Sequence, residues 1–210
     1  IDSTLDSVTH QIRSTEETRK VYPFDFVLRI RHILKGRILT VSWKVANNSD
    51  TDMYFAIGGH PAFNVNVLPG TDFEDYFLVF KEGTESLSYV LLDTESGTAI
   101  ADKTYKLKLT DSKYALKKGM FDKDALVFDN GQIEWAALAL PDGKPYIALE
   151  SKGFPNFGIW SKPGAPYVCL EPWCGRCDNR GFEGEISEKP GVNTLKVGEV
   201  FEKSYDIIVY

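Results

Sequence analysis

Short runs of alternating hydrophobic and polar residues, separated by turn residues, extend along almost the whole chain. Hydrophobic and polar residues alternate in the later part of residues 24–33 and throughout residues 38–45. Residues 35–37, which lie between these two runs, are typical of a turn. Alternation with a two-residue period turns one side of a strand toward a core, so this segment predicts a β-hairpin. Further strands are expected at residues 53–57, 76–80, 88–92, 105–109, 125–128, 134–140, 146–150, 157–160, 167–171 and 200–210.

The chain contains no pattern typical of a long amphipathic helix, and residues 113–120 are expected to form one helical turn at most. Regularly spaced short strands without helices are typical of an antiparallel β-sandwich or barrel. The sequence has no internal repeat, low-complexity segment or change of composition that would indicate a linker. We therefore expect a single all-β domain over residues 1–210.

The charge balance excludes several classes of partner. The chain has 24 Lys and Arg residues against 30 Asp and Glu residues, for a net charge of −6. The basic residues are scattered, so no positive stripe is available to bind nucleic acid or an anionic membrane. No apolar stretch is long enough for a membrane helix, and we expect no signal peptide, because the chain does not open with a charged segment followed by an apolar one. We expect neither nucleic acid nor a membrane as a partner.

Three cysteines lie close together, at positions 169, 174 and 177. An odd, crowded set is a poor disulfide framework, which indicates a reducing compartment and hence a cytoplasmic protein. Cys174 and Cys177 have the spacing of a redox or zinc motif, but the sequence lacks a second ligand pair and a strand-to-helix context. We predict no metal site, and leave open a redox role for this pair.

His60 is the first candidate for chemistry. It follows an expected strand and stands in the sequence Gly58-Gly59-His60-Pro61, where two glycines and a proline make a stiff loop. Such loops at strand ends often present polar groups for function. Asn64 adds a hydrogen-bonding group suited to a hydroxylated ligand. The alternative is a histidine with a structural role in a tight turn.

Glu171 is the second candidate, at the end of an apolar run and before Pro172 and Trp173. Trp173 and Trp160 could supply flat faces for a sugar ring, although core packing would explain either residue equally well. Asp124 stands at the entry to an expected strand, where a carboxylate could bind sugar hydroxyls or simply form a turn.

Two segments resemble the aldose 1-epimerases, which are also called galactose mutarotases. Residues 55–64 are similar to the family's His-Pro-aromatic-Asn segment, and residues 168–173 with Gly175 and Arg176 resemble its later Cys-Leu-Glu segment, in the form of the LacX-like branch. Residues 22–24 and 195–199 also resemble that branch. The resemblance extends along nearly the whole chain.

This resemblance implies a β-supersandwich that interconverts the α and β anomers of a free aldose, without a cofactor or metal. His60 matches the general acid that protonates the ring oxygen, and Glu171 matches the general base at the anomeric hydroxyl. It places Asp124 at the substrate, and the remaining substrate-binding candidates are Asn64, Trp160, Trp173 and Arg176. The expected partner is a small-molecule sugar, and the expected state is a monomer or homodimer.

The sequence departs from the family at one place. The family carries a further histidine upstream in a His-Gly motif, but here His10 precedes Gln11 and His32 precedes Ile33. Because the chain begins with Ile1 in the middle of a strand-like pattern, we expect that it lacks an N-terminal part. The alternatives are a non-catalytic carbohydrate-binding protein and a plain structural β-sandwich. A phosphorylated sugar, with Arg176 and Arg180 as candidate contacts, also remains open as the substrate.

Overall fold

The computed structural model describes residues 2–210, which form an almost entirely β structure with two main sheets. All strand pairs within these sheets are antiparallel. The larger sheet has nine strands in the order β1 (Asp2–Ser3), β2 (Ser7–Arg13), β3 (Phe26–Lys35), β4 (Ile38–Asn47), β18 (Val200–Val209), β14 (Pro145–Glu150), β13 (Trp135–Ala139), β8 (Phe77–Phe80) and β11 (Lys113–Ala115).

The smaller sheet has five strands, and its longest strand, β16, pairs with three others. It consists of β12 (Leu126–Phe128), β15 (Asn156–Trp160), β16 (Tyr167–Cys174), β6 (Ile57–Gly58) and β7 (Ala62–Asn64). Two strand pairs stand apart, β9 (Ser86–Tyr89) with β10 (Tyr105–Lys108) and β5 (Met53–Phe55) with β17 (Asn193–Leu195). The short helices are α1 (Glu16–Arg19) and the 3-10 turns η1 (Phe73–Asp75) and η2 (Ile186–Glu188).

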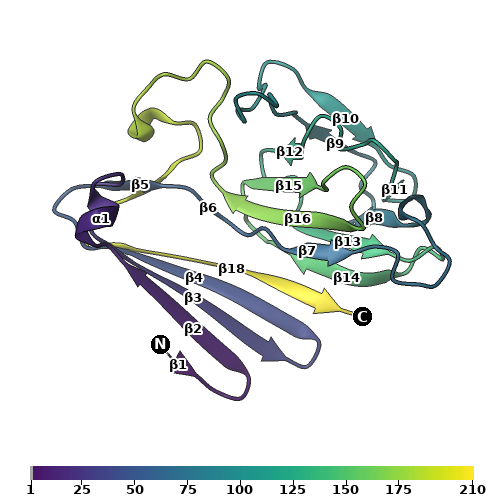
Figure 1. The fold of residues 1–210 in the computed structure, drawn as a ribbon, viewed down its shortest axis with the longest axis horizontal. Coiled ribbons are helices and arrows are strands. Elements are labelled where there is room, and N and C mark those ends of the chain that lie inside the picture. Colours follow the sequence, from purple (N-terminus) through teal and green to yellow (C-terminus); the bar gives the residue numbers. More distant parts are fainter. Residues whose placement is uncertain (1) are drawn as a thin grey trace.

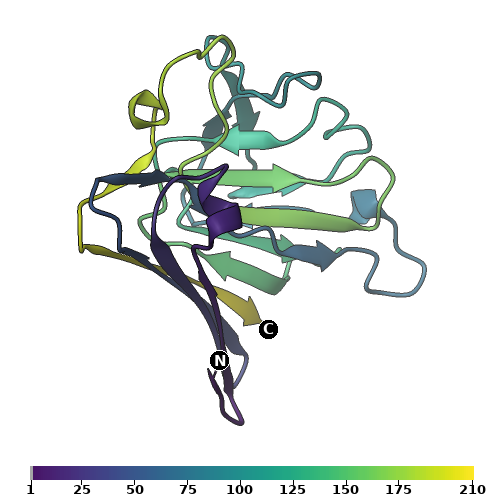
Figure 2. The same cartoon turned by 60° about the vertical axis from the view of Figure 1, so that its left-hand side comes forward.

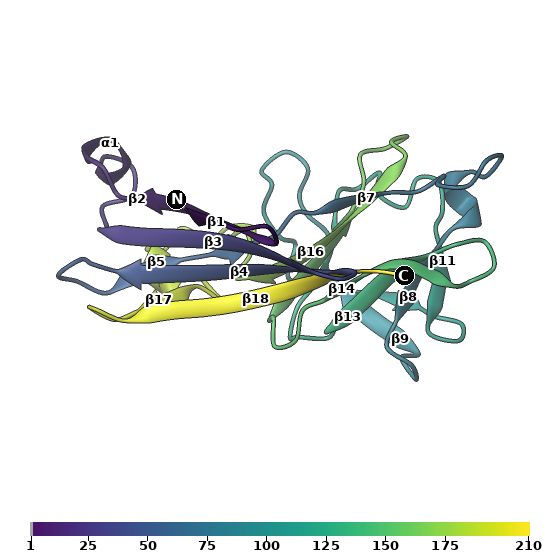
Figure 3. The ribbon, with the colours of Figure 1, turned by 90° about the horizontal axis from the view of Figure 1, so that it is seen from below.

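The two sheets overlap over only part of their area. Figure 1 shows β12, β15 and β16 beside β13 and β14, while β2, β3, β4 and β18 extend away to one side. The view in Figure 2 shows the hairpins of these long strands projecting beyond the rest of the molecule. Figure 3, a view from below, shows that β18 connects the long strands β2, β3 and β4 to β14, β13 and β8 in the rest of the nine-stranded sheet.

The main core lies between the two sheets. Leu78, Leu138 and Leu149 contribute from the nine-stranded sheet, and Phe157 and Leu170 contribute from the five-stranded sheet, each no more than 1% exposed. Burying a side chain of this size stabilises the fold by about 1.5–3 kcal/mol. The strands of both sheets are therefore held firmly where they meet. Among residues 2–210, no helix has the length and apolar character needed to cross a membrane.

The expected fold class, a single antiparallel β-sandwich domain, is confirmed. The predicted hairpin is β3 and β4, joined at Gly36 with a φ of +59°. Residues 113–120, where one helical turn at most was expected, contain no helix, and residues Lys113–Ala115 form β11 and pair with β8. Strand β2 was not predicted, since its apolar residues Val8 and Ile12 face solvent and give little core signal.

Candidate active site

Strand β16 carries two chemically different faces. Val168 and Leu170 point into the main core and are fully buried. Side chains alternate along a strand, so Cys169, Glu171 and Trp173 point to the opposite face. The two-residue period therefore places the candidate carboxylate on the side of the sheet away from the main core.

The strand register brings His60 opposite Glu171. Strands β6 and β7 both pair with β16, one on either side of the loop that holds His60, and their registers agree. Gly58 is paired with Trp173. Because the strands are antiparallel, the residue two positions after Gly58, His60, lies opposite the residue two positions before Trp173, Glu171. Directly opposed residues share one face of a sheet. Two residues that are 111 positions apart in the sequence (60 and 171) thus meet through sheet pairing.

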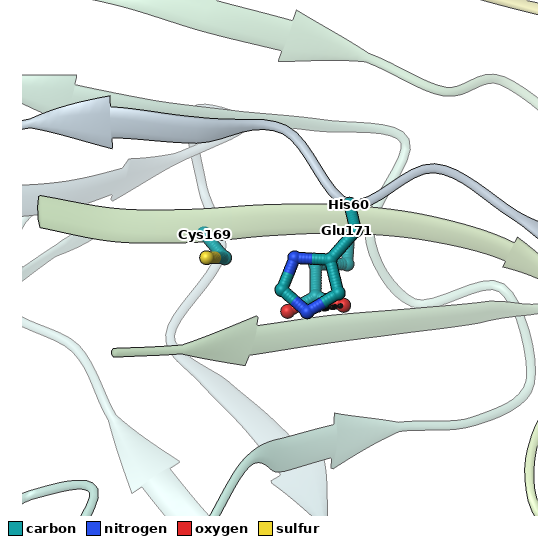
Figure 4. Close-up of side chains that lie close together, drawn as sticks. All are labelled: His60, Cys169 and Glu171. Atoms are coloured by element: carbon teal, nitrogen blue, oxygen red, sulfur yellow. Dashed lines mark ion pairs between the residues drawn. The ribbon is translucent and has the colours of Figure 1, made fainter. Parts of the chain in front are cut away.

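The two side chains are in contact. The Nε2 atom of His60 lies 3.4 Å from Oε2 of Glu171, within ion-pair distance for a protonated imidazole. Figure 4 shows the imidazole standing over the carboxylate on the same side of β16. The His60 side chain is 62% exposed and that of Glu171 only 4%. The ring of Trp160 packs against the imidazole edge to face, with 6.0 Å between centroids. The pair thus has a buried carboxyl and an accessible imidazole.

The surroundings of Glu171 oppose ionisation. Burial raises the pKa of its carboxyl to about 7, and the negative charge of Asp124 adds to the rise. A hydrogen bond from the Trp173 side chain acts in the other direction by favouring the carboxylate. A carboxyl with a pKa near neutrality can both accept and release a proton at physiological pH.

The indole of Trp173 lies against two glycines in neighbouring strands. A Cβ atom at Gly58 would come within 2.4 Å of Cδ1 of the indole, and one at Gly158 within 2.4 Å of Cζ2. The ring therefore lies across β16 where two side chains are missing. This position lets the indole N–H donate to Glu171. Trp173 was predicted as a sugar contact, and its hydrogen bond to Glu171 was not foreseen.

The remaining predicted residues differ in their distance from the pair. Asp124 is near enough to influence the pKa of Glu171, in a left-handed conformation with a φ of +69°, and its Oδ1 accepts a hydrogen bond from the amide of Ala125. Asn64 lies in β7, opposite Tyr167 of β16. By strand alternation it shares the face of Glu171.

Arg176 is engaged in the protein interior. Its Nε atom donates to Oδ1 of Asp129 at 2.9 Å and its Nη2 atom donates to Oδ2 at 3.1 Å, while Nη1 donates to the carbonyl of Cys177. Asn156 also donates to Asp129, at 2.7 Å. The Arg176 side chain is only 10% exposed. Its guanidinium thus forms a bidentate pair with Asp129.

Cys169 is a member of the site that was not predicted. Its thiol lies on the Glu171 face, and burial together with the Glu171 charge raises its pKa to about 12. The ligand atoms of His60, Cys169 and Glu171 lie within 4.8 Å of one another, so these three could hold a metal ion. The two-residue spacing from Glu171 was the signal in the sequence, because it assigns both residues to one strand face.

Comparison with known proteins gives a concordant picture. The family model described as aldose 1-epimerase matches residues 2–207. The chain is 30% identical to protein LacX of Lactococcus lactis over 207 residues, covering 97% of this chain and 69% of LacX. Its fold is similar to a galactose mutarotase related enzyme from Lactobacillus acidophilus, with a TM-score of 0.91, 31% identity, and coverage of 100% of this chain and 69% of the other. A galactose mutarotase-like protein from Lactobacillus casei matches with a TM-score of 0.85, 25% identity, and coverage of 100% and 72%.

Proposed function

Since the chain belongs to the aldose 1-epimerase family, we propose that it interconverts the α and β anomers of a free hexose such as galactose or glucose. The observation that supports this proposal most directly is the contact between His60 and Glu171 across paired strands. One residue can donate a proton and the other can accept one. The two side chains are in contact on one face of the sheet, so both can reach the same bound sugar.

Ring opening requires two proton transfers, one at each of the two oxygens bonded to the anomeric carbon. The carboxylate of Glu171 removes the proton from the anomeric hydroxyl, while the protonated imidazole of His60 delivers a proton to the ring oxygen. The bond between the anomeric carbon and the ring oxygen breaks as the aldehyde forms. Rotation about the neighbouring carbon–carbon bond exposes the other aldehyde face, and the same groups then act in reverse. General acid–base catalysis of this kind contributes about 10²- to 10⁴-fold.

The electrostatics of Glu171 suit the role of base. A base is most effective when its pKa lies near the working pH, and burial raises the pKa of this carboxyl to about 7. The indole of Trp173 holds the carboxylate oriented by a hydrogen bond. His60, which is largely exposed, is free to meet a sugar that arrives from solvent.

Other side chains on the same face are proposed to bind the sugar. Trp160, which packs beside the imidazole, offers an aromatic face to the apolar side of the ring. Asp124 and Asn64 offer hydrogen bonds to hydroxyl groups. Arg176 is a weaker candidate, because its donors already bond Asp129 and a backbone carbonyl.

The two arginines considered as phosphate contacts are already paired with carboxylates, which favours an uncharged sugar over a sugar phosphate. Arg176 is paired with Asp129, and Arg180 lies 4.0 Å from Asp93 and 3.7 Å from Asp102. Binding a phosphate would require these guanidinium groups to leave their carboxylates.

The three cysteines are all free in the structure. Free thiols persist in a reducing compartment such as the cytoplasm, which is where we place this activity.

Polarimetry tests the proposed function. Freshly dissolved α-galactose or α-glucose should reach its equilibrium rotation faster than in buffer, at a rate proportional to protein concentration. A rate equal to that of buffer would contradict the proposal. Calorimetric binding of either sugar without acceleration would instead favour a non-catalytic carbohydrate-binding protein.

A further inference from the structure

We propose that His60, Cys169 and Glu171 form a binding site for one thiophilic divalent cation of the Zn²⁺ type, and that this cation and the sugar exclude each other. The exclusion rests on the proposed function, because it assumes that the sugar occupies the same pair. Cation binding itself does not rest on the proposed function, since it depends only on the three side chains. The site would allow a divalent cation to switch off the acid–base pair.

The three side chains offer the donor atoms that zinc prefers. An imidazole nitrogen, a thiol sulfur and a carboxylate oxygen lie within 4.8 Å of one another. Zinc binds these atoms at about 2.0–2.3 Å in a tetrahedron, which places the ligand atoms about 3.4–3.7 Å apart. The contact between His60 and Glu171 is already 3.4 Å. Only a small movement is needed to complete the set, and the exposed His60 side chain is free to make it.

The charges of the ligands match those of a divalent cation. Glu171 and Cys169 are both buried, at 3% and 1% exposure, and each would carry one negative charge as a ligand. Two unpaired negative charges in such a place would be costly. A divalent cation replaces the thiol proton and neutralises both groups, while neutral His60 completes the first three positions.

The fourth position of the tetrahedron would face solvent. The His60 side chain is 62% exposed, and Figure 4 shows it in front of the Glu171 carboxylate, with Cys169 beside it on the same strand as Glu171. Three protein ligands with an open position are typical of an accessible zinc site. A sugar that uses His60 and Glu171 would enter from this same side, so cation and sugar compete for the same two side chains.

Titration with Co²⁺ tests the proposal, because a cobalt–thiolate bond gives a charge-transfer absorption in the near ultraviolet. We expect this band to saturate at one Co²⁺ per chain and Zn²⁺ to displace it. Cys169→Ser should abolish the band. His60→Ala, at an exposed position that tolerates truncation, should weaken Co²⁺ binding at least about tenfold. The matched control Cys177→Ser removes a thiol outside the site and should leave the band unchanged.

The absence of a band in the wild-type protein would overturn the proposal, as would a band that persists in Cys169→Ser or binds equally well in His60→Ala. If Cys169→Ser does not fold, the Co²⁺ affinities of His60→Ala and Cys177→Ser still test the proposal, because only the first of these variants lacks a proposed ligand. Saturating galactose should raise the apparent Kd for Co²⁺. A protein that binds Co²⁺ through Cys169 but does not accelerate mutarotation would leave the cation site standing and remove the proposed function. Mutarotation that 1:1 Co²⁺ fails to inhibit would overturn the exclusion.

Discussion

The two faces of β16 are both buried but are used differently. On one face, Val168 and Leu170 pack into the main core, where they contribute only to stability. On the other face, Cys169 and Glu171 are almost as well buried, yet they carry ionisable groups. A smaller apolar cluster that includes Val127 packs with the nearby tryptophans on this second side. Burial thus stabilises the protein on one face and changes the pKa of a carboxyl on the other.

The contrast shows that residues that stabilise the core and residues that carry ionisable groups can alternate along a single strand. Neighbouring residues in β16 are separated by one step in the sequence but by the full thickness of the sheet. Since the side-chain period of a strand is two, a one-residue slip of register would bury Glu171 in the core and expose Leu170 on the site face. The large core between the sheets therefore fixes the register on which the site depends.

The largest effect is expected from Glu171→Gln, which keeps the shape of the side chain but removes the base. The mutarotation rate should fall by about 10³-fold, within the range for loss of a general base. Polarimetry with fresh α-galactose measures it. Glu150→Gln, at an exposed position at the end of β14, is the matched control and should keep the wild-type rate. Equal rates in all three proteins would show that Glu171 is not the base.

The opposite face should show the reverse behaviour. Leu170→Ala removes a fully buried side chain from the main core and should lower the free energy of unfolding by about 2–5 kcal/mol. Urea unfolding followed by circular dichroism measures the loss. The activity per folded molecule should stay within a few fold of wild type, because the Glu171 face is retained. A large loss of activity with little loss of stability would contradict the assignment of this face to stability and of the opposite face to catalysis.

Stability should also depend on pH through Glu171. Its folded pKa is raised from 4.5 to about 7, so the folded state holds a proton that the unfolded state releases. The corresponding stabilisation is full below pH 4.5 and is lost as the pH rises through 7, by about 3 kcal/mol in total. Unfolding midpoints at pH 5 and pH 8 should differ more in the wild type than in Glu171→Gln. An identical difference in both proteins would assign the pH dependence to other groups.

The smallest effect concerns the support of the carboxylate. Gly158→Ala introduces a Cβ atom 2.4 Å from the Trp173 indole, which must move. We expect a loss of about 1–3 kcal/mol from overpacking, together with a lower mutarotation rate as Glu171 loses its donor. Tryptophan fluorescence and polarimetry report the two effects. Gly164→Ala, where no atom lies within 4 Å of the added carbon and φ is +80°, controls for destabilisation by a glycine substitution that does not touch the indole. Unchanged fluorescence in Gly158→Ala would contradict the proposed position of the indole.

Much of the fold followed from local patterns in the sequence. The run at residues 167–171 predicted β16, and His60 was expected in a loop that follows a strand. Family resemblance singled out both His60 and Glu171. The role of Cys169 could have been read from its two-residue spacing to Glu171, because both must share a strand face.

The rest depends on contacts between distant segments. The pairing of Arg176 with Asp129 joins positions 47 residues apart, and no local pattern distinguishes a paired arginine from a free one. The hydrogen bond from Trp173 to Glu171 depends on Gly158, which lies on a neighbouring strand. Strand β11, at residues Lys113–Ala115, was not predicted, and its pairing with β8 joins segments more than 30 residues apart.

The central claim is that a buried carboxyl, held opposite an accessible imidazole, is the base of the reaction. The pH profile of kcat/KM for mutarotation, corrected for the rate in buffer, tests it most directly. The profile should rise with an apparent midpoint near pH 7, the value to which burial raises the pKa of Glu171. A rise centred near pH 4.5, or a rate independent of pH between 5 and 8, would contradict the assignment of Glu171 as the base.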